Sequence, residues 1–147
     1  MEKEYIQTGK LKYVIRDFPL ESIHKNAFKA AQAAYCAGQQ GKYWEMHERL
    51  FVHQNALNPS DLPSHAQALA LDAPTFHQCL ESEQTAAVIR KDIEEGQKLG
   101  VRSTPTFLIG LTEQDGSRVK ALKLLRGARV YTAFKSVLDG LLAAQKR

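Results

Sequence analysis

Apolar and polar residues alternate over Leu11–Phe18, and this stretch is rich in β-branched and aromatic side chains. Alternation with a period of two is typical of a half-buried strand, so we expect a strand here. A short apolar run over Thr106–Leu111 predicts a second, buried strand. The Asp115–Gly116 pair after it favours a turn into a third strand near Ala121–Leu125, so these two strands should form an antiparallel hairpin.

Between the first two strands, apolar residues recur every three to four positions, which predicts a block of helices. Asp72 is a candidate N-cap, and Gly100 is a candidate residue just beyond a helix end. The most regular stripe consists of alanines, which allow a helix to lie close to its neighbour (Ala27, Ala30, Ala31 and Ala34). The expected helices are His24–Tyr35, Lys42–Asn55, Asp61–Leu71, Asp72–Leu80, Ser82–Leu99 and, after the hairpin, Val130–Gln145.

The composition favours one domain with a proper core, because the chain has 147 residues of which 44% are hydrophobic. The net charge of +4 is spread along the chain without interleaved aromatics, which argues against nucleic acid as a partner. No apolar run reaches the length of about 18 residues that a membrane span needs. The N-terminus, Met1–Tyr5, is charged and has no apolar signal-peptide region, which as it stands favours the cytoplasm.

The five histidines do not follow a metal-ligand spacing, so we expect no metal (His24, His47, His53, His65 and His77). We find no glycine-rich phosphate loop and no Ser-His-Asp pattern, and we expect no cofactor. His47 shares a helix face with Trp44 and Phe51. We therefore expect a half-buried, hydrogen-bonded His47 and a Trp44 that belongs to the core.

Thr104 and Pro105 stand directly before the second strand, shortly after the helical pattern ends at Gly100. A proline that enters a buried strand must lie where no ladder hydrogen bond is needed. Thr-Pro at such an entrance is also a candidate for a cis peptide bond. The arrangement is similar to the cis-proline loop of the thioredoxin fold, which normally faces a Cys-x-x-Cys pair. This sequence contains no Cys-x-x-Cys.

Motifs over nearly the whole chain resemble the DsbA family of thiol–disulfide oxidoreductases, and their common order and spacing make the resemblance specific. They are Glu4-Tyr5-Ile6-x-Thr8-Gly9-Lys10, Arg16-Asp17-Phe18-Pro19-Leu20, His24 with the alanine stripe, Cys36-Ala37, Gly41-Lys42-Tyr43-Trp44-x-x-His47, Leu50-Phe51, Phe76-x-x-Cys79-Leu80 and Thr104-Pro105. The resemblance implies an α/β, thioredoxin-like fold with an inserted helical domain. It implies a single domain over residues 1–147, with the helical block at about 22–99 and the thioredoxin-like part at 1–21 and 100–147. Kappa-type glutathione transferases share the inserted fold, but the Cys36 and Cys79 pair and the Gly-Lys-Tyr-Trp segment favour the DsbA-like alternative.

The departure from the family lies at the N-terminus, where the first core strand and the Cys-x-x-Cys pair should precede the Glu4-Tyr5-Ile6 segment. The fold is therefore expected to be incomplete there, in a chain that is either a fragment of a longer protein or a degenerate copy. The absent strand would lie between Leu11–Phe18 and Thr106–Leu111. Both neighbours would then expose unpaired edges, which could be filled by homo-oligomerisation.

The resemblance implies thiol–disulfide exchange outside the cytoplasm, namely disulfide formation or isomerisation in secreted proteins. Its partners would be extended thiol-containing polypeptides and a redox partner protein. Thr104 and Pro105 are the implied substrate-binding residues. No catalytic residue is expected in this chain without the cysteine pair, so enzymatic activity stays open. The alternative is a non-catalytic, thioredoxin-like module that binds peptides or a partner.

Cys36 and Cys79 each lie near the C-terminal end of an expected helix, where the dipole does not favour a thiolate. Three states stay open for them: a structural disulfide, two buried free thiols, or a redox-active pair. In some DsbA-like proteins a second, non-catalytic disulfide joins equivalent helices, which makes the structural disulfide the first expectation. Such a bridge would close a loop of 43 positions and contribute about 4 kcal/mol.

Overall fold

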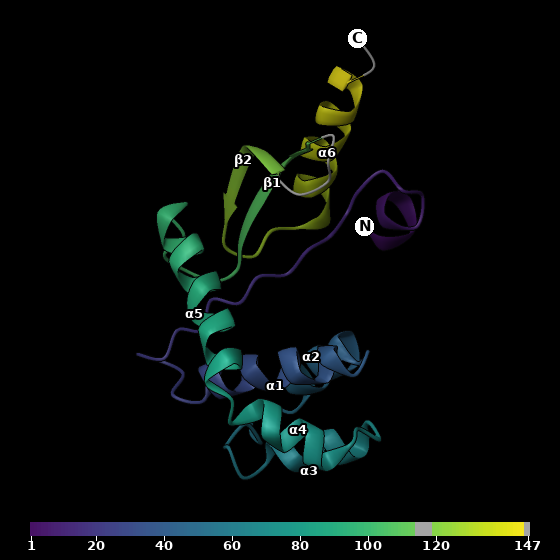
Figure 1. Ribbon diagram of the computed structural model, residues 1–147. Helices are drawn as coiled ribbons and strands as arrows, with labels where there is room; N and C mark the ends of the chain where they lie inside the picture. The colour runs from purple at the N-terminus through teal and green to yellow at the C-terminus, as the bar shows by residue number, and fades with distance from the viewer. Residues whose placement is uncertain (114–118, 146–147) are drawn as a thin grey trace. The chain divides into compact units, whose positions relative to one another are not determined.

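The computed structural model describes residues 1–113 and 119–145 (Figure 1). The chain divides into two compact units, which we describe separately. The helical unit is Arg16–Gly100, and the hairpin unit consists of Met1–Ile15 together with Val101–Arg147.

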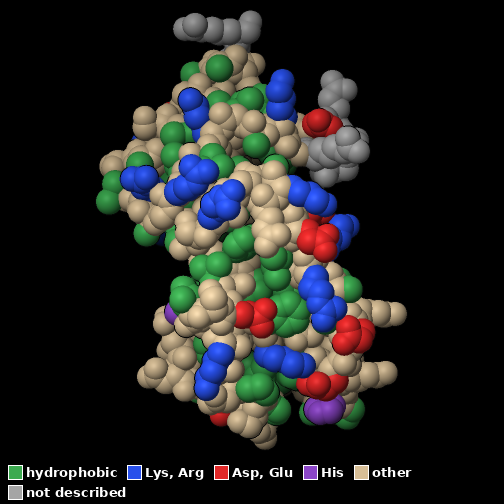
Figure 2. All heavy atoms as spheres, turned by 90° about the vertical axis from the view of Figure 1, so that its left-hand side faces the viewer, with side chains coloured by type: hydrophobic (Ala, Val, Ile, Leu, Met, Phe, Trp, Pro, Cys, Tyr) green, Lys and Arg blue, Asp and Glu red, His purple; other side chains and the backbone are tan. Residues whose placement is uncertain are grey.

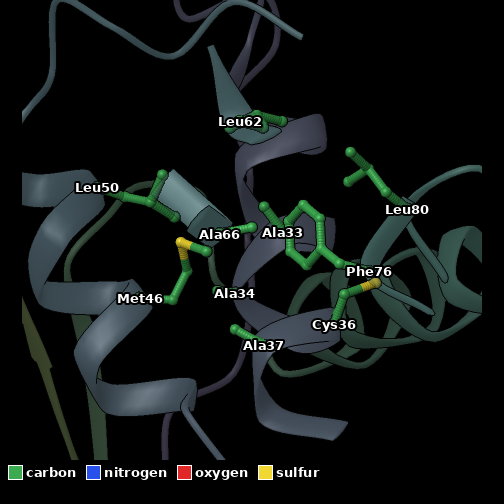
Figure 3. Packing of buried hydrophobic residues seen from close by; sticks show 10 residues of the cluster. All are labelled: Ala33, Ala34, Cys36, Ala37, Met46, Leu50, Leu62, Ala66, Phe76 and Leu80. Carbon is green, nitrogen blue, oxygen red and sulfur yellow. The ribbon is translucent and has the colours of Figure 1, made fainter. Parts of the chain in front are cut away.

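The helical unit is built around one central helix that contacts the four others. These helices are α1 (Ala27–Gln39) at the centre, then α2 (Tyr43–Val52), α3 (Leu62–Ala68), α4 (Ala73–Leu80) and α5 (Glu83–Lys98). Alanines on α1 allow the close approach, since Ala33, Ala34 and Ala37 are all buried in the core. Figure 3 shows larger side chains from the other helices around them, among them Met46, Leu62 and Phe76.

Local capping chemistry sets two helix starts and one helix end in this unit. The Asp72 carboxylate accepts a hydrogen bond from the Thr75 N–H at the start of α4. The Ser82 hydroxyl accepts a hydrogen bond from the Gln84 N–H at the start of α5. α5 ends before Gly100, whose φ of +77° is the left-handed conformation that glycine adopts readily.

The hairpin unit consists of a short π-helical turn, η1 (Glu2–Ile6), two strands and a C-terminal helix. The strands β1 (Thr106–Thr112) and β2 (Val119–Arg126) pair antiparallel, from Thr106 opposite Arg126 to Thr112 opposite Val119. The register shifts between Ile109 and Gly110 and leaves an extra residue in β2, a β-bulge. Helix α6 (Tyr131–Gln145) packs against the hairpin. The Phe134 and Phe107 rings meet edge-on, with their centroids 4.7 Å apart. The expected turn at Asp115–Gly116 lies outside the described residues.

The expected strand over Leu11–Phe18 is wrong: the segment is irregular throughout. A strand is defined by a hydrogen-bonded neighbour, and the one ladder among the described residues joins β1 to β2. The N–H of Leu11 instead bonds to Tyr5 O, and the N–H of Asp17 bonds to the Asp92 carboxylate. The alternating pattern is therefore present without the partner that would make it a strand.

The expectation that Trp44 belongs to the core is also wrong, since its side chain is 51% exposed. Helix α2 buries Met46 and Leu50, and this face excludes Trp44, His47 and Phe51. Those three form a separate stripe, in which the centroid of the His47 ring is 5.9 Å from that of Trp44 and 4.8 Å from that of Phe51. His47 is half-buried there, and this burial lowers its pKa.

Candidate functional site

The loop before β1 is the part of the hairpin unit that carries the expected substrate-binding residues. The Thr104–Pro105 peptide bond is cis, and both residues are exposed. Pro105 O accepts a hydrogen bond of 2.8 Å from Gly127 N, which continues the β1–β2 ladder by one pair. The Thr106 hydroxyl donates to Ser103 O at 2.7 Å. These two bonds hold the exposed loop on the end of the hairpin.

The hydrogen bond from Gly127 N to Pro105 O also shows which backbone groups of β1 are directed away from β2. Because Pro105 bonds to the β2 side, the alternation of an antiparallel ladder directs the next residue, Thr106, to the opposite edge. The same holds for Leu108. Their N–H and C=O groups therefore line the edge of β1 that faces away from β2, beside the Thr104–Pro105 loop. An extended polypeptide can form main-chain hydrogen bonds to such an edge.

The two cysteines are joined in a disulfide within the helical unit, with Cα atoms 5.7 Å apart. Cys36 is fully buried in the last turn of α1, whereas Cys79 lies half-buried in the last turn of α4. The Cys79 sulfur is also 3.4 Å from the Thr85 hydroxyl. Neither sulfur lies at a helix N-terminus, so the helix dipole does not stabilise a thiolate at either position. Of the candidate residues, Cys36 and Cys79 are therefore bonded to each other in the helical unit. Thr104 and Pro105 lie in the exposed loop of the hairpin unit.

No group of three or more metal-ligand side chains occurs within residues 1–113 and 119–145. Among these same described residues, no helix is both long and apolar enough to cross a bilayer.

Asp17 carries a carboxyl group with a raised pKa, which the sequence pattern did not indicate. Asp92 is buried and accepts hydrogen bonds from the Arg16 guanidinium at 2.8 Å and from the Asp17 N–H at 3.1 Å. Burial, and then the negative charge of Asp92, raise the pKa of Asp17 to about 6. This carboxyl can therefore exchange a proton near neutral pH. The motif around Asp17 is visible in the sequence, but its partner lies 75 positions away.

A second polar cluster anchors η1 to α6 in the hairpin unit. Tyr5 donates to Asp139 at 2.6 Å, and Tyr131 donates to Glu4 at 2.6 Å. The hydrogen bond to Glu4 raises the pKa of Tyr131 to about 12. Lys135 lies between these pairs and donates to Glu4 at 3.1 Å. The adjoining hollow of about 330 Å³ is lined by Glu4, Tyr5, Thr8, Lys10, Lys135 and Asp139.

Solved structures of a DsbA protein are similar to this chain. Alpha-DsbA1 of Wolbachia pipientis aligns with a TM-score of 0.78 and 28% identity, covering 97% of this chain and 74% of that one. A variant of the same protein, in which two cysteines are replaced by alanine, gives the same TM-score at 26% identity and the same coverage.

Curated relatives include proteins named as ion transporters. The Na(+)/H(+) antiporter NhaA 1 of Salinispora arenicola is 38% identical over 125 residues, which is 84% of this chain and 19% of that protein. NhaA 3 of Salinispora tropica is 37% identical over 127 residues, or 86% of this chain and 19% of that protein. The chain spans about a fifth of the length of these relatives.

The sequence also matches the family described as Thioredoxin over residues 1–124, which is most of its length. Together with the fold of the DsbA structures, this match identifies the chain as a member of the thioredoxin family, with a DsbA-like thioredoxin fold.

Proposed function

We propose that this chain is the polypeptide-binding part of a DsbA-like thiol–disulfide exchange protein. The observation that carries the proposal is the exposed Thr104–Pro105 loop, which leads directly onto the edge of β1 that faces away from β2. An extended, cysteine-containing polypeptide would pair with the backbone of Thr104, the residue before the proline, at this exposed loop. Pro105, which has no N–H, would lie at the end of that edge.

The exchange chemistry itself needs a thiolate that attacks a disulfide sulfur. Cys36 and Cys79 are the two cysteines of this sequence, and both are held in the disulfide of the helical unit. The proposal therefore assigns exchange to a cysteine pair that these 147 residues do not contain. It includes a redox partner protein and an oxidising compartment outside the cytoplasm. The Cys36–Cys79 bond supports that compartment, because disulfides persist where the surroundings are oxidising.

The binding step can be tested with the chain as it stands. An isotope-labelled sample titrated with a reduced, extended cysteine peptide should show amide shifts at the loop, namely at Ser103, Thr104 and Thr106. Thr104→Glu places a charge on the exposed loop and should weaken binding at least tenfold, about 1.4 kcal/mol. Thr112→Glu, at the exposed far end of β1, is the matched control and should bind as the parent does. Equal effects of the two substitutions, or shifts confined to other residues, would contradict the proposal.

The assignment of the chemistry has its own test. In an insulin reduction assay with dithiothreitol, we expect the chain to add nothing to the rate of the reductant alone. Cys36→Ala/Cys79→Ser should behave identically. If the parent accelerates the reaction and this variant does not, the pair Cys36–Cys79 is redox-active and the assignment is wrong.

The relatives named Na(+)/H(+) antiporters favour a second candidate, a non-catalytic module that binds a membrane transporter. In this case the same loop and strand edge would hold a segment of the transporter instead of a thiol substrate. The chain should then bind vesicles that contain an NhaA antiporter and leave lipid-only vesicles unbound. Thr104→Glu should abolish that binding, and the reduced peptide should compete with it. Binding to both kinds of vesicle would exclude this candidate.

A further inference from the structure

The arginines of the helical unit and those of the hairpin unit differ in what their side chains contact. Each of the three arginines of the helical unit has a polar partner within 3.3 Å: Arg16 bonds to Asp92, Arg49 to the His65 ring, and Arg90 to Glu83. The arginines that the structure describes in the hairpin unit are Arg102, Arg126 and Arg129, and all three are exposed. None of their side chains forms an ion pair or a hydrogen bond with the described part of the chain. Their guanidinium groups are therefore available to a partner.

These three residues, the loop arginines, come from both chain segments that meet at the Thr104–Pro105 loop. Arg102 lies two positions before the loop. Arg126 is the register partner of Thr106, the first residue after the loop. Arg129 lies three positions beyond Arg126. The end of β2 is hydrogen-bonded to the loop, so the loop arginines lie at the same end of the hairpin.

The direction of the Arg126 side chain follows from the register of the hairpin. Residues directly opposite in an antiparallel pair project to the same face, and successive residues of a strand project to opposite faces. Phe107 and its partner Leu125 lie on the face that helix α6 covers, since the Phe107 ring contacts the Phe134 ring. Arg126 is the next residue of β2 and projects to the other face, beside Thr106. Helix α6 therefore leaves this guanidinium uncovered.

The charge of the hairpin unit favours an anionic partner. Its sequence, Met1–Ile15 and Val101–Arg147, contains twelve Lys or Arg against five Asp or Glu, whereas Arg16–Gly100 contains eight against eleven. Figure 2 shows basic side chains spread over the unit that carries the hairpin. Within the described residues of 101–130, the one acidic residue is Glu113, which follows β1 at the end remote from the loop. An anion that approaches the loop therefore meets arginines and no nearby carboxylate of this segment.

Two of the loop arginines lie away from the strand edge at which the family resemblance implies a further strand. That strand would pair with β1. Arg126 and Arg129 lie instead at the end of β2 and just after it, on the other side of the hairpin. A strand paired with β1 would therefore be one strand removed from these two arginines.

We propose that the loop arginines select extended polypeptides with acidic residues close to the cysteine. The inference rests on the proposed function, because it names the substrate class of the same loop. A guanidinium presents its N–H groups in a planar fork that matches the two oxygens of a carboxylate. A single exposed ion pair is weak, so the selectivity comes from several arginines acting on one peptide. Their charge also steers an acidic peptide to the loop, and salt screens this attraction.

Two reduced cysteine peptides of equal length test the selectivity on the unsubstituted chain. One peptide has glutamate on both sides of the cysteine, and the other has lysine at the same positions. Calorimetry measures their dissociation constants at about 0.01 M and about 1 M salt, where the Debye length is about 30 Å and about 3 Å. We expect the acidic peptide to bind about tenfold tighter than the basic one at low salt, and this preference to be largely lost at high salt.

A charge reversal at either end of β2 provides the matched variants. Arg126→Glu should reduce the preference for the acidic peptide severalfold, because it places a carboxylate beside the loop. Lys120→Glu makes the same change at an exposed residue opposite Leu111, towards the other end of the strand, and should keep most of the preference. The readout is the ratio of the two dissociation constants, since a loss of folded protein would weaken both peptides alike.

The outcomes separate this inference from the proposed function. Equal affinities at low salt, with both peptides bound at the loop, would overturn the inference and leave the proposed function standing. Amide shifts away from the loop for both peptides would overturn the proposed function, and the inference with it. Equal effects of Arg126→Glu and Lys120→Glu would overturn the inference, because the net charge of the chain would then attract the peptide. A single-stranded DNA of the same charge that bound the loop as tightly as the acidic peptide would also overturn it, because the loop would then accept any polyanion.

Discussion

Gly110 is the residue of β1 that leaves no space for a side chain. A Cβ at this position would lie 2.0 Å from Lys120 O and 2.8 Å from Ala121 Cα, both backbone atoms of β2. Since backbone atoms of a paired strand cannot move aside cheaply, we expect Gly110→Ala to destabilise the hairpin unit by about 1–3 kcal/mol. Hydrogen exchange of the β1 and β2 amides, which reports local opening free energies, measures this loss.

Gly140 is the matched control for this substitution. It lies inside α6, and a Cβ there meets no atom within 4 Å. Alanine is favoured over glycine in a helix interior by about 1 kcal/mol, so Gly140→Ala should stabilise α6. The two substitutions should therefore have opposite signs. Destabilisation by both would show that the space around Gly110 is not the cause.

Asp17 makes the helical unit less stable as its carboxyl ionises. Its pKa in the fold is raised to about 6 from 3.8, so the stability it contributes is present below about pH 4 and lost as the pH rises through 6. Asp17→Asn keeps the shape and should remove this pH dependence. At pH 7.5 we expect the variant to be more stable by up to about 3 kcal/mol. Urea unfolding followed at several pH values by Trp44 fluorescence measures the difference.

Asp72 provides the opposite case for comparison. Hydrogen bonds from the side chain and the backbone of Thr75 lower the pKa of Asp72, so its contribution is present at neutral pH and lost on acidification. Asp72→Ala should therefore destabilise at pH 7.5 and have less effect at pH 3. An Asp17→Asn protein whose stability still fell between pH 4 and 6 would show that a different group titrates.

At the scale of elements, the disulfide joins α1 to α4 across 43 positions of sequence. A bridge of this span restricts the unfolded chain and stabilises the fold by about 4 kcal/mol in the chain-entropy argument. Cys36→Ala/Cys79→Ser should lower the free energy of unfolding of the helical unit by roughly that amount. Guanidinium unfolding with and without dithiothreitol measures it.

The control is the response of the two proteins to the reductant. Dithiothreitol should destabilise the parent and leave the double variant unaffected, because the variant has no bond to break. Alanine suits the fully buried Cys36, where a hydroxyl would be left without a partner. A parent with the same stability under both conditions would show that the loop is already ordered in the unfolded chain.

Helices were predicted from sequence more accurately than strands, and the reason is the range of the interactions that form them. The start of α4 at Asp72 and the end of α5 before Gly100 depend on caps a few residues away, and both were predicted correctly. α1 runs from Ala27 to Gln39 and not from His24 to Tyr35, and its last turn carries Cys36 and Ala37, which are buried in the core. The strand predicted over Leu11–Phe18 failed because a strand needs a distant partner.

At the scale of the whole molecule, sequence motifs were sufficient for the thioredoxin-like fold, which the family match and the DsbA structures confirm. They did not predict the contacts between residues far apart in sequence. Asp17 is 75 positions from Asp92, and no local pattern links the two. The exposure of Trp44 was missed for a related reason: two faces of α2 are apolar, and only the packing on α1 decides which is buried.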